Sequence, residues 1–170
     1  MMKDQFIEQQ GIYLLSHSVG LPQKTAKSAA DLGFWQPWMA GNEKIWDHWL
    51  GEIERFRGQL GRLLNSDASH FCPQTTISSA VNKIIFSLTP ETHKNIILMS
   101  EEDFPSVAYA LQQSKTLGYH MRYIPAGLNL NDLDVWNQYL SDDVALVLVT
   151  QVQSNNGVQL PIEAITAMAS

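Results

Sequence analysis

Three short apolar segments alternate with helical patterns in the second half of the chain, and this alternation constrains the fold more than any other feature of the sequence. The segments are NIILM at 95–99, YHMRYI at 119–124 and VALVLVT at 144–150. Strands that alternate with helices favour an α/β layer with a parallel sheet. Because VALVLVT is apolar on both faces, we expect it to be a central strand. Right-handed crossovers would bring the loops after the strands to one edge, where ligands usually bind.

Helical patterns precede these strands and separate them. Apolar residues recur at steps of three and four from Ile45 to Leu63, which predicts a long amphipathic helix. Further helices are predicted at 77–88, up to about Thr116, at 131–140 and from near Pro161. The first forty residues are punctuated by Gly and Pro and are predicted to be irregular. We therefore expect an irregular segment at 1–41 and an α/β region at 42–170.

The 170 residues suit one domain or a large piece of one. The formal net charge is −6 and the eleven Lys and Arg are spread thinly, so a nucleic-acid backbone is not favoured as a partner. Cys72 is the only cysteine, which excludes an internal disulfide and a zinc site made of thiolates. The N-terminus MMKDQFIEQQ lacks the apolar core of a signal peptide, and no run approaches the roughly twenty apolar residues that span a bilayer. We expect a soluble, cytoplasmic protein without a membrane partner.

Common catalytic and nucleotide-binding motifs are absent from the sequence. It contains no Walker motif, no G-x-G-x-x-G and no G-x-S-x-G elbow. The five histidines show no metal-ligand spacing, so no metal site is predicted. Four of the five tryptophans lie within 35–49 and are expected to serve packing. The candidate chemistry therefore lies in three loops of the predicted α/β region.

The first loop, PQTTISSAVNK at 73–83, surrounds a predicted helix start with hydroxyl side chains. These hydroxyls can cap the free backbone N–H groups of the helix. The same N–H groups, at the positive end of the helix dipole, also form a phosphate cradle. The sequence leaves both interpretations open, and the cap alone is the more common case.

The second loop, EEDFPSVAY at 101–109, places an aromatic residue at another helix start. Pro105 suits the first turn of a helix, and the three acidic residues before Phe104 suit its positive end. Phe104 then serves either as a hydrophobic staple or as a surface on which a flat ligand stacks. The third loop, TQVQSNNGVQLP at 150–161, combines ordinary Asn-Gly turn chemistry with a dense set of amides suited to orienting a polar ligand.

Four segments, in this order and spacing, resemble the first half of the class V aminotransferase-fold enzymes, which are fold-type I pyridoxal-phosphate (PLP) proteins. The segments are YLLSHSVGLP at 13–22, FCPQTTISSAVNKIIFSL at 71–88, FPSVAYAL at 104–111 and VTQVQSNNGVQLPIEAI at 149–165. The kynureninase and cysteine-desulfurase branch is the most similar, and FPSVAYAL resembles the kynureninase-type FPSDHYAI. The resemblance implies that 42–170 is the first part of a three-layer α/β/α large domain with a mostly parallel sheet. The irregular or helical segment at 1–41 would then lie near the active-site entrance.

The resemblance also implies roles toward PLP for individual residues. Ile77 and Ser78 match the positions that contact the cofactor phosphate through the backbone and a hydroxyl. Phe104 matches the aromatic residue that stacks on the pyridine ring. Ser154 or Asn155 falls near the position that faces a substituent of the ring, with one loop residue of slippage allowed.

Two departures from the family pattern limit what the resemblance implies. His17 and Ser18 match the entrance segment of the family and are expected to contact substrate. The first departure is Val107, which replaces the acid of the kynureninase-type FPSD. The Asp that pairs with the pyridine nitrogen and the Schiff-base Lys come after the region that this sequence covers, and Lys115 is the last lysine here. We therefore expect no catalytic residue in this chain, weak or absent PLP binding by the chain alone, and no activity alone.

The complete enzyme is expected to be a homodimer that acts on an amino-acid substrate, because members of the resembled family usually are. One alternative is a non-catalytic relic or a dimerisation module that retains the α/β half-domain. Another is an unrelated α/β nucleotide-binding domain, which the missing glycine fingerprint disfavours.

Overall fold

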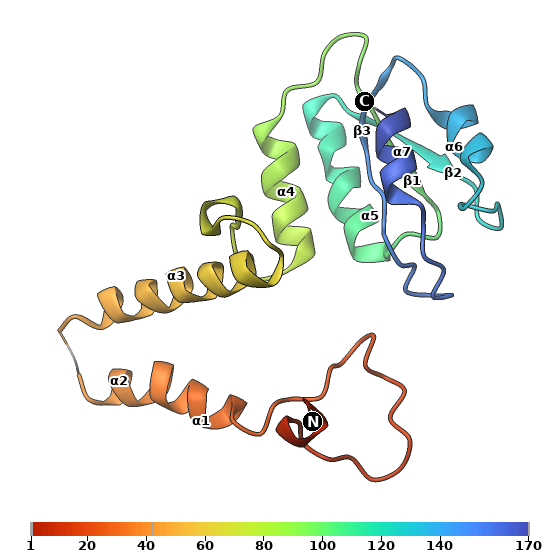
Figure 1. Ribbon diagram of the computed structural model, residues 1–170. Coiled ribbons are helices and arrows are strands. Elements are labelled where there is room, and N and C mark those ends of the chain that lie inside the picture. Colours follow the sequence, from red (N-terminus) through yellow and green to blue (C-terminus); the bar gives the residue numbers. More distant parts are fainter. Residues whose placement is uncertain (1, 42, 170) are drawn as a thin grey trace. The chain divides into compact units, whose positions relative to one another are not determined.

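The computed structural model describes residues 2–41 and 43–169, which form two compact units, Met1–Pro73 and Gln74–Ser170 (Figure 1). The units divide the chain at a different point from the expected segments of 1–41 and 42–170. The reason is that helix α3 (Ile45–Leu63) contacts the π-helical turn η2 (Asp31–Trp35) and so belongs with the residues that precede it.

The first unit is helical in its regular parts. The predicted amphipathic helix from Ile45 to Leu63 is confirmed as α3. The shorter elements are η1 (Met2–Gln5), α1 (Ala26–Ala30), η2, α2 (Gln36–Met39) and η3 (Ala68–His70). Among the described residues of both units, no helix is long and apolar enough to cross a membrane.

Within the N-terminal segment predicted as irregular or helical, the run from Ala26 to Met39 is helical, in α1, η2 and α2. Pro37 is tolerated because it lies in the first turn of α2. A proline has no N–H to donate to the carbonyl of Gly33, four residues before it. Nε2 of His48, on α3, lies 2.9 Å from that carbonyl oxygen and takes the place of the missing donor. Glycine and proline therefore modify a helix here without preventing it.

The second unit alternates helices and strands as predicted (Figure 1). Its strands are β1 (Ile96–Ser100), β2 (His120–Ile124) and β3 (Val144–Val147). Its helical elements are α4 (Ile77–Ser87), α5 (Pro105–Gln112), η4 (Gln113–Leu117), α6 (Leu133–Tyr139) and α7 (Ile162–Met168). Each predicted strand and helix of this unit is present at or near its expected position.

The three strands form a parallel sheet in the order β2-β1-β3, so the predicted parallel pairing is confirmed. Among the three described strands β1 lies in the middle and β3 at the edge, so the expectation that VALVLVT is a central strand of the complete sheet stays a prediction. An apolar run reports that both faces of a strand are covered, and it carries no information about the strand's lateral position. Pairing continues beyond β3, since Leu148 N donates to Leu98 O at 2.9 Å.

The sheet carries a hydrophobic core on each face, and successive residues of β1 enter opposite cores. Leu98 packs in a cluster with Trp136 of α6 and Ile165 of α7. Ile97 and Met99 pack in the other cluster, whose helical members come from α4 and α5 (Ile85, Val107 and Leu111). This alternation follows from the period of two in a strand. The result is a three-layer α/β/α arrangement with α4 and α5 on one face and α6 and α7 on the other.

Candidate functional site

The loops that follow β1 and β3 are joined by a buried carboxylate at the carboxyl edge of the sheet. Asp103 is only 6% exposed. Its Oδ2 accepts a hydrogen bond from the backbone N–H of Ser100 at 2.9 Å, and its Oδ1 accepts one from the hydroxyl of Thr150 at 2.6 Å. Thr150 follows β3 and lies 47 positions away in sequence. The two loops are therefore held together by one side chain.

The two acidic residues before Asp103 bind neighbouring loops in the same way. Glu101 accepts from the backbone N–H of Ala126 at 3.0 Å, in the loop after β2. Glu102 accepts from the N–H of Gly127 at 3.1 Å and from the side-chain amide of Asn156 at 3.4 Å. The sequence predicted that these acids serve the dipole of the following helix. In the structure α5 has no acidic residue in its first turn, and the three carboxylates accept from the backbone of Ser100 in β1 and from donors in other loops.

Phe104 is the N-cap residue of α5, with extended backbone angles of φ −61° and ψ 126°, and Pro105 follows it at the helix start. A hydrophobic staple would need the ring one position earlier and packed on the helix. Phe104 is instead 55% exposed and belongs to neither core cluster. The staple interpretation is therefore wrong, and the ring remains available for another contact.

The start of α4 lies beside the start of α5. Thr76 caps α4, since its hydroxyl accepts from the backbone N–H of Ser79 at 3.1 Å, and the predicted cap is confirmed. Helix geometry leaves the N–H groups of Ile77 and Ser78 without an intrahelical partner. The hydroxyl of Ser78 donates to the carbonyl of Ser106 in α5 at 3.3 Å. Two positive helix ends and the exposed Phe104 ring therefore lie in one region.

The loop after β3 forms a short hairpin, closed by an antiparallel bridge between Val152 and Gln159. Ser154 and Asn155 lie exposed in its turn. Gln153 is 2% exposed, and its buried Nε2 has no hydrogen-bond partner among the described residues. Buried amide donors are almost always paired, so Gln153 is a candidate ligand contact. The sequence singles it out only as one of the dense set of amides in this loop, and the family resemblance assigns the cofactor contact to Ser154 or Asn155.

His17 and Ser18, the expected substrate contacts, lie in an exposed turn of the first unit. The turn is closed by a hydrogen bond from Ser18 N to Leu15 O at 3.0 Å, and the hydroxyl of Tyr13 donates to Val19 O at 2.5 Å. Their role toward a substrate stays a prediction. No three His, Cys, Asp or Glu side chains within residues 2–41 and 43–169 are grouped in a way that could hold a metal ion.

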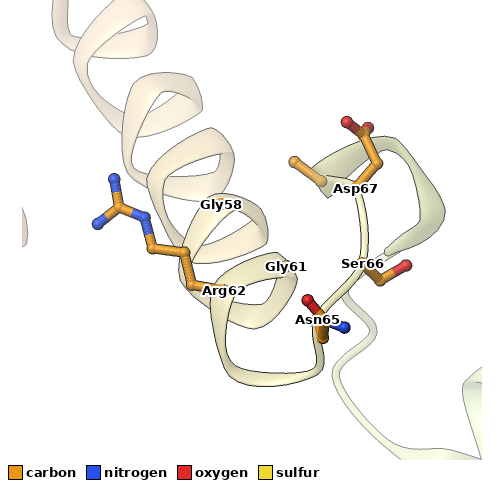
Figure 2. Close-up of a pocket in the computed structure, with 7 residues that line it drawn as sticks. Gly58, Gly61, Arg62, Asn65, Ser66 and Asp67 are labelled. Carbon is orange, nitrogen blue, oxygen red and sulfur yellow. The ribbon is translucent and has the colours of Figure 1, made fainter.

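A recess of about 530 Å³ lies at the end of α3 in the first unit, and it contains none of the predicted site residues (Figure 2). Its geometry explains Gly61, because a Cβ there would lie 2.7 Å from the carbonyl oxygen of Ser66. The chain turns through Asn65, whose φ is 51°. Hydrogen bonds from Ser69, first from its side chain and then from its backbone, lower the pKa of Asp67. These features describe a tight helix ending.

Comparison with known proteins assigns the chain to a family. The family model described as aminotransferase class-V matches residues 49–170. The chain belongs to this family. The class-V match covers α3 from Trp49 onward and the whole second unit, including the loops that carry Ile77, Ser78, Phe104 and Gln153. It confirms the resemblance inferred from the sequence.

Among curated proteins, this class-V chain is 27% identical over 168 residues to a kynureninase of Deinococcus radiodurans, covering 93% of the chain and 39% of the kynureninase. Two structures of C-DES have the same fold with a TM-score of 0.77. One has glycine covalently linked to its PLP cofactor (19% identical), and the other is the cystine C-S lyase with its product cysteine persulfide (18% identical). Each match covers 89% of this chain, and the two matches cover 40% and 41% of the respective C-DES chains. A NifS-like protein matches with a TM-score of 0.59 and 17% identity, over 69% of this chain and 33% of that protein. The chain thus spans about two fifths of the kynureninase and of C-DES.

Proposed function

We propose that the second unit is the part of a PLP-dependent class-V enzyme that receives the phosphate and one face of the cofactor ring, and that the enzyme acts on an amino-acid substrate. The observation that carries this proposal is Phe104. Its ring is exposed at the N-cap of α5, while the backbone beside it is hydrogen-bonded to the start of α4 through Ser78 and Ser106. The C-DES structure with glycine linked to PLP supports the choice of cofactor.

The described residues fit the three kinds of group on PLP. The free N–H groups of Ile77 and Ser78, at the positive end of α4, suit a phosphate. The exposed ring of Phe104 suits the flat pyridine. The unpaired amide of Gln153 is a hydrogen-bond donor for a polar substituent of the ring, and Ser154 and Asn155 are its neighbours in the same turn. When bound, PLP supplies an electron sink for bonds at the α-carbon of an amino acid.

Weak binding and no turnover by the 170-residue chain alone are part of the proposal. The family's chemistry needs a lysine beside the cofactor. In the second unit, Lys94 precedes β1 and Lys115 precedes β2, so both lie at the amino edge of the sheet, opposite the candidate site. Nζ of Lys83 donates to the side chain of Gln74 at 2.5 Å. A homodimeric, cytoplasmic complete enzyme is also proposed, as in the resembled family.

An NMR titration of the chain with pyridoxine 5′-phosphate tests this function. The probe has the ring and phosphate of PLP but an alcohol in place of the aldehyde, so it cannot form imines with surface lysines. We expect amide shifts at Ile77 and Ser78 and ring shifts at Phe104 at millimolar probe concentrations. Pyridoxine, which lacks the phosphate, serves as the control and should bind more weakly. Absence of shifts at all three residues would refute the proposal.

A cluster of aromatic residues in the first unit favours a second candidate, an interaction module. Phe34 stacks on Trp49 at 5.1 Å between ring centroids, and Trp35 stacks on Trp38 at 5.8 Å. Trp35, Trp38 and Trp46 are 49%, 55% and 69% exposed. Exposed aromatic surface of this kind marks protein contacts. Sedimentation velocity over a concentration series decides this, because a monomer at all concentrations contradicts self-association of the chain.

A further inference from the structure

Asp103 is a buried carboxylate that has only neutral hydrogen-bond donors in the part of the chain that the structure describes. Its partners are the backbone N–H of Ser100 and the hydroxyl of Thr150, at 2.9 and 2.6 Å. None of the ion pairs formed by the described residues includes it. Burying a carboxylate without a cation is unfavourable unless its hydrogen bonds are well made. The burial of the Asp103 carboxylate against these two donors therefore requires a structural explanation.

The positions of the two partners give that explanation. The bond to Ser100 closes the turn that follows β1, and Asp103 N donates back to Ser100 O at 3.2 Å. The bond to Thr150 crosses to the loop after β3, three residues before Gln153. Asp103 itself directly precedes Phe104. One carboxylate thus connects the backbone that carries the aromatic ring to the backbone that carries the unpaired amide.

We propose that Asp103 is a positioning residue that clamps the loop after β1 to the loop after β3, and so holds Phe104 and Gln153 at a fixed separation for a ligand between them. This inference rests on the proposed function for the nature of the ligand. The clamp itself is a property of the free chain. Glu102 forms a weaker second link between the same two loops, because its hydrogen bond with Asn156 is 3.4 Å long and more exposed.

The competing explanation is that Asp103 shapes only its own turn. In that case the hydrogen bond to Ser100 fixes the turn, and the hydrogen bond from Thr150 does not affect the position of either loop. The two explanations differ in what Thr150→Val does. Under the clamp this variant removes the donor that Asp103 needs across the loops, whereas Thr150→Ser keeps a hydroxyl at the same place.

Amide hydrogen exchange on the full chain, with Asp103→Asn, Thr150→Val and Thr150→Ser, distinguishes the two explanations without any ligand. Three amides of the β3 loop report on it, because Gln153 N, Gly157 N and Leu160 N all donate within the hairpin. We expect exchange about tenfold faster at these amides in Asp103→Asn and in Thr150→Val, as for the loss of one charge-assisted bond. Thr150→Ser should exchange like the wild type.

Asp143→Asn is the matched control, because Asp143 is also hydrogen-bonded but precedes β3 at the opposite edge of the sheet. It should leave exchange in both loops unchanged. Faster exchange confined to residues 100–106 in Asp103→Asn, or wild-type exchange in Thr150→Val, would overturn the clamp. If Asp103→Asn does not fold, Thr150→Val and Thr150→Ser still decide the question.

Titration of the same variants with pyridoxine 5′-phosphate separates the clamp from the proposed function. We expect affinity about tenfold weaker in Thr150→Val and wild-type affinity in Thr150→Ser, in step with the exchange rates. If the wild type does not bind the probe but exchange in the two loops is coupled, the proposed function fails and the clamp stands. If the wild type binds the probe and Thr150→Val changes neither exchange nor affinity, the clamp fails and the proposed function stands.

Discussion

Replacing Phe104 by alanine is expected to weaken ligand binding while changing the stability of the fold little more than a comparable surface substitution does. Phe104 is 55% exposed, so less than half of it is covered. A phenylalanine buries about 200 Å² when fully covered, which leaves roughly 90 Å² covered here. At about 25 cal/mol per Å², the upper bound on lost stability is about 2 kcal/mol. Phe86, which is 56% exposed on α4, has the same bound.

The effect on ligand binding distinguishes Phe104 from Phe86. Stacking of a flat ring on Phe104 adds about 0.5–1.5 kcal/mol beyond area burial, which corresponds to a dissociation constant roughly 2- to 13-fold higher in Phe104→Ala. Phe86→Ala should bind the probe like the wild type. Phe104→Tyr keeps the aromatic face and should retain most of the affinity. NMR titration with pyridoxine 5′-phosphate gives the dissociation constants, and thermal unfolding gives the stability of each variant.

Equal affinity for the probe in Phe104→Ala, Phe86→Ala and the wild type would refute stacking on Phe104. A loss of stability in Phe104→Ala well above that in Phe86→Ala would refute the structural half of the reasoning, because it would mean that the ring at position 104 contributes to packing. The two results are independent, so each half can fail by itself.

Two further substitutions test the local physics of the fold. Gly61→Ala should destabilise the chain by about 1–3 kcal/mol in thermal unfolding, because its Cβ would lie 2.7 Å from Ser66 O, whereas Gly58→Ala, which meets nothing within 4 Å, should stabilise α3 by about 0.5–1 kcal/mol. Hydrogen bonds from Arg122 lead the causes that lower the pKa of Asp143 below 3.8, so the ionised carboxylate stabilises the fold above that pH and the contribution is lost as pH falls through the lower folded value. Asp143→Asn should therefore lower the melting temperature at pH 7, and the difference from the wild type should close on acidification; a difference that persists when the carboxylate is protonated contradicts this.

The elements of the second unit could be predicted because their signals are local. Helices such as α4 follow from apolar spacing, and strands such as β1 follow from short apolar runs between turns. The order of the strands could not be read in the same way. VALVLVT and NIILM are both apolar on both faces, and only the pairing of β1 with both neighbours distinguishes the centre from the edge.

The candidate site was predicted in part for the same reason. The cap at Thr76 and the helix start at Pro105 depend on neighbours in sequence and are present as expected. Thr150, the distant partner of Asp103, and the partners of Glu102 lie in other loops, so no local pattern indicates them. The burial of Gln153 depends on how the hairpin after β3 folds back. The sequence alone does not determine which residue of this loop faces inward, to within one position.

In the proposed site, the backbone around the exposed Phe104 ring is already hydrogen-bonded before a ligand arrives. The backbone before the ring is fixed through Asp103, and the backbone after it is tied to α4 through Ser106. A mobile loop with an exposed aromatic residue would lose conformational entropy when it ordered around a ligand. Here the hydrogen bonds have already ordered the backbone, while the Phe104 ring packs in neither core cluster and the side-chain amide of Gln153 has no partner among the described residues. A ligand that stacks on the ring and accepts from the amide therefore gains both contacts with little further ordering.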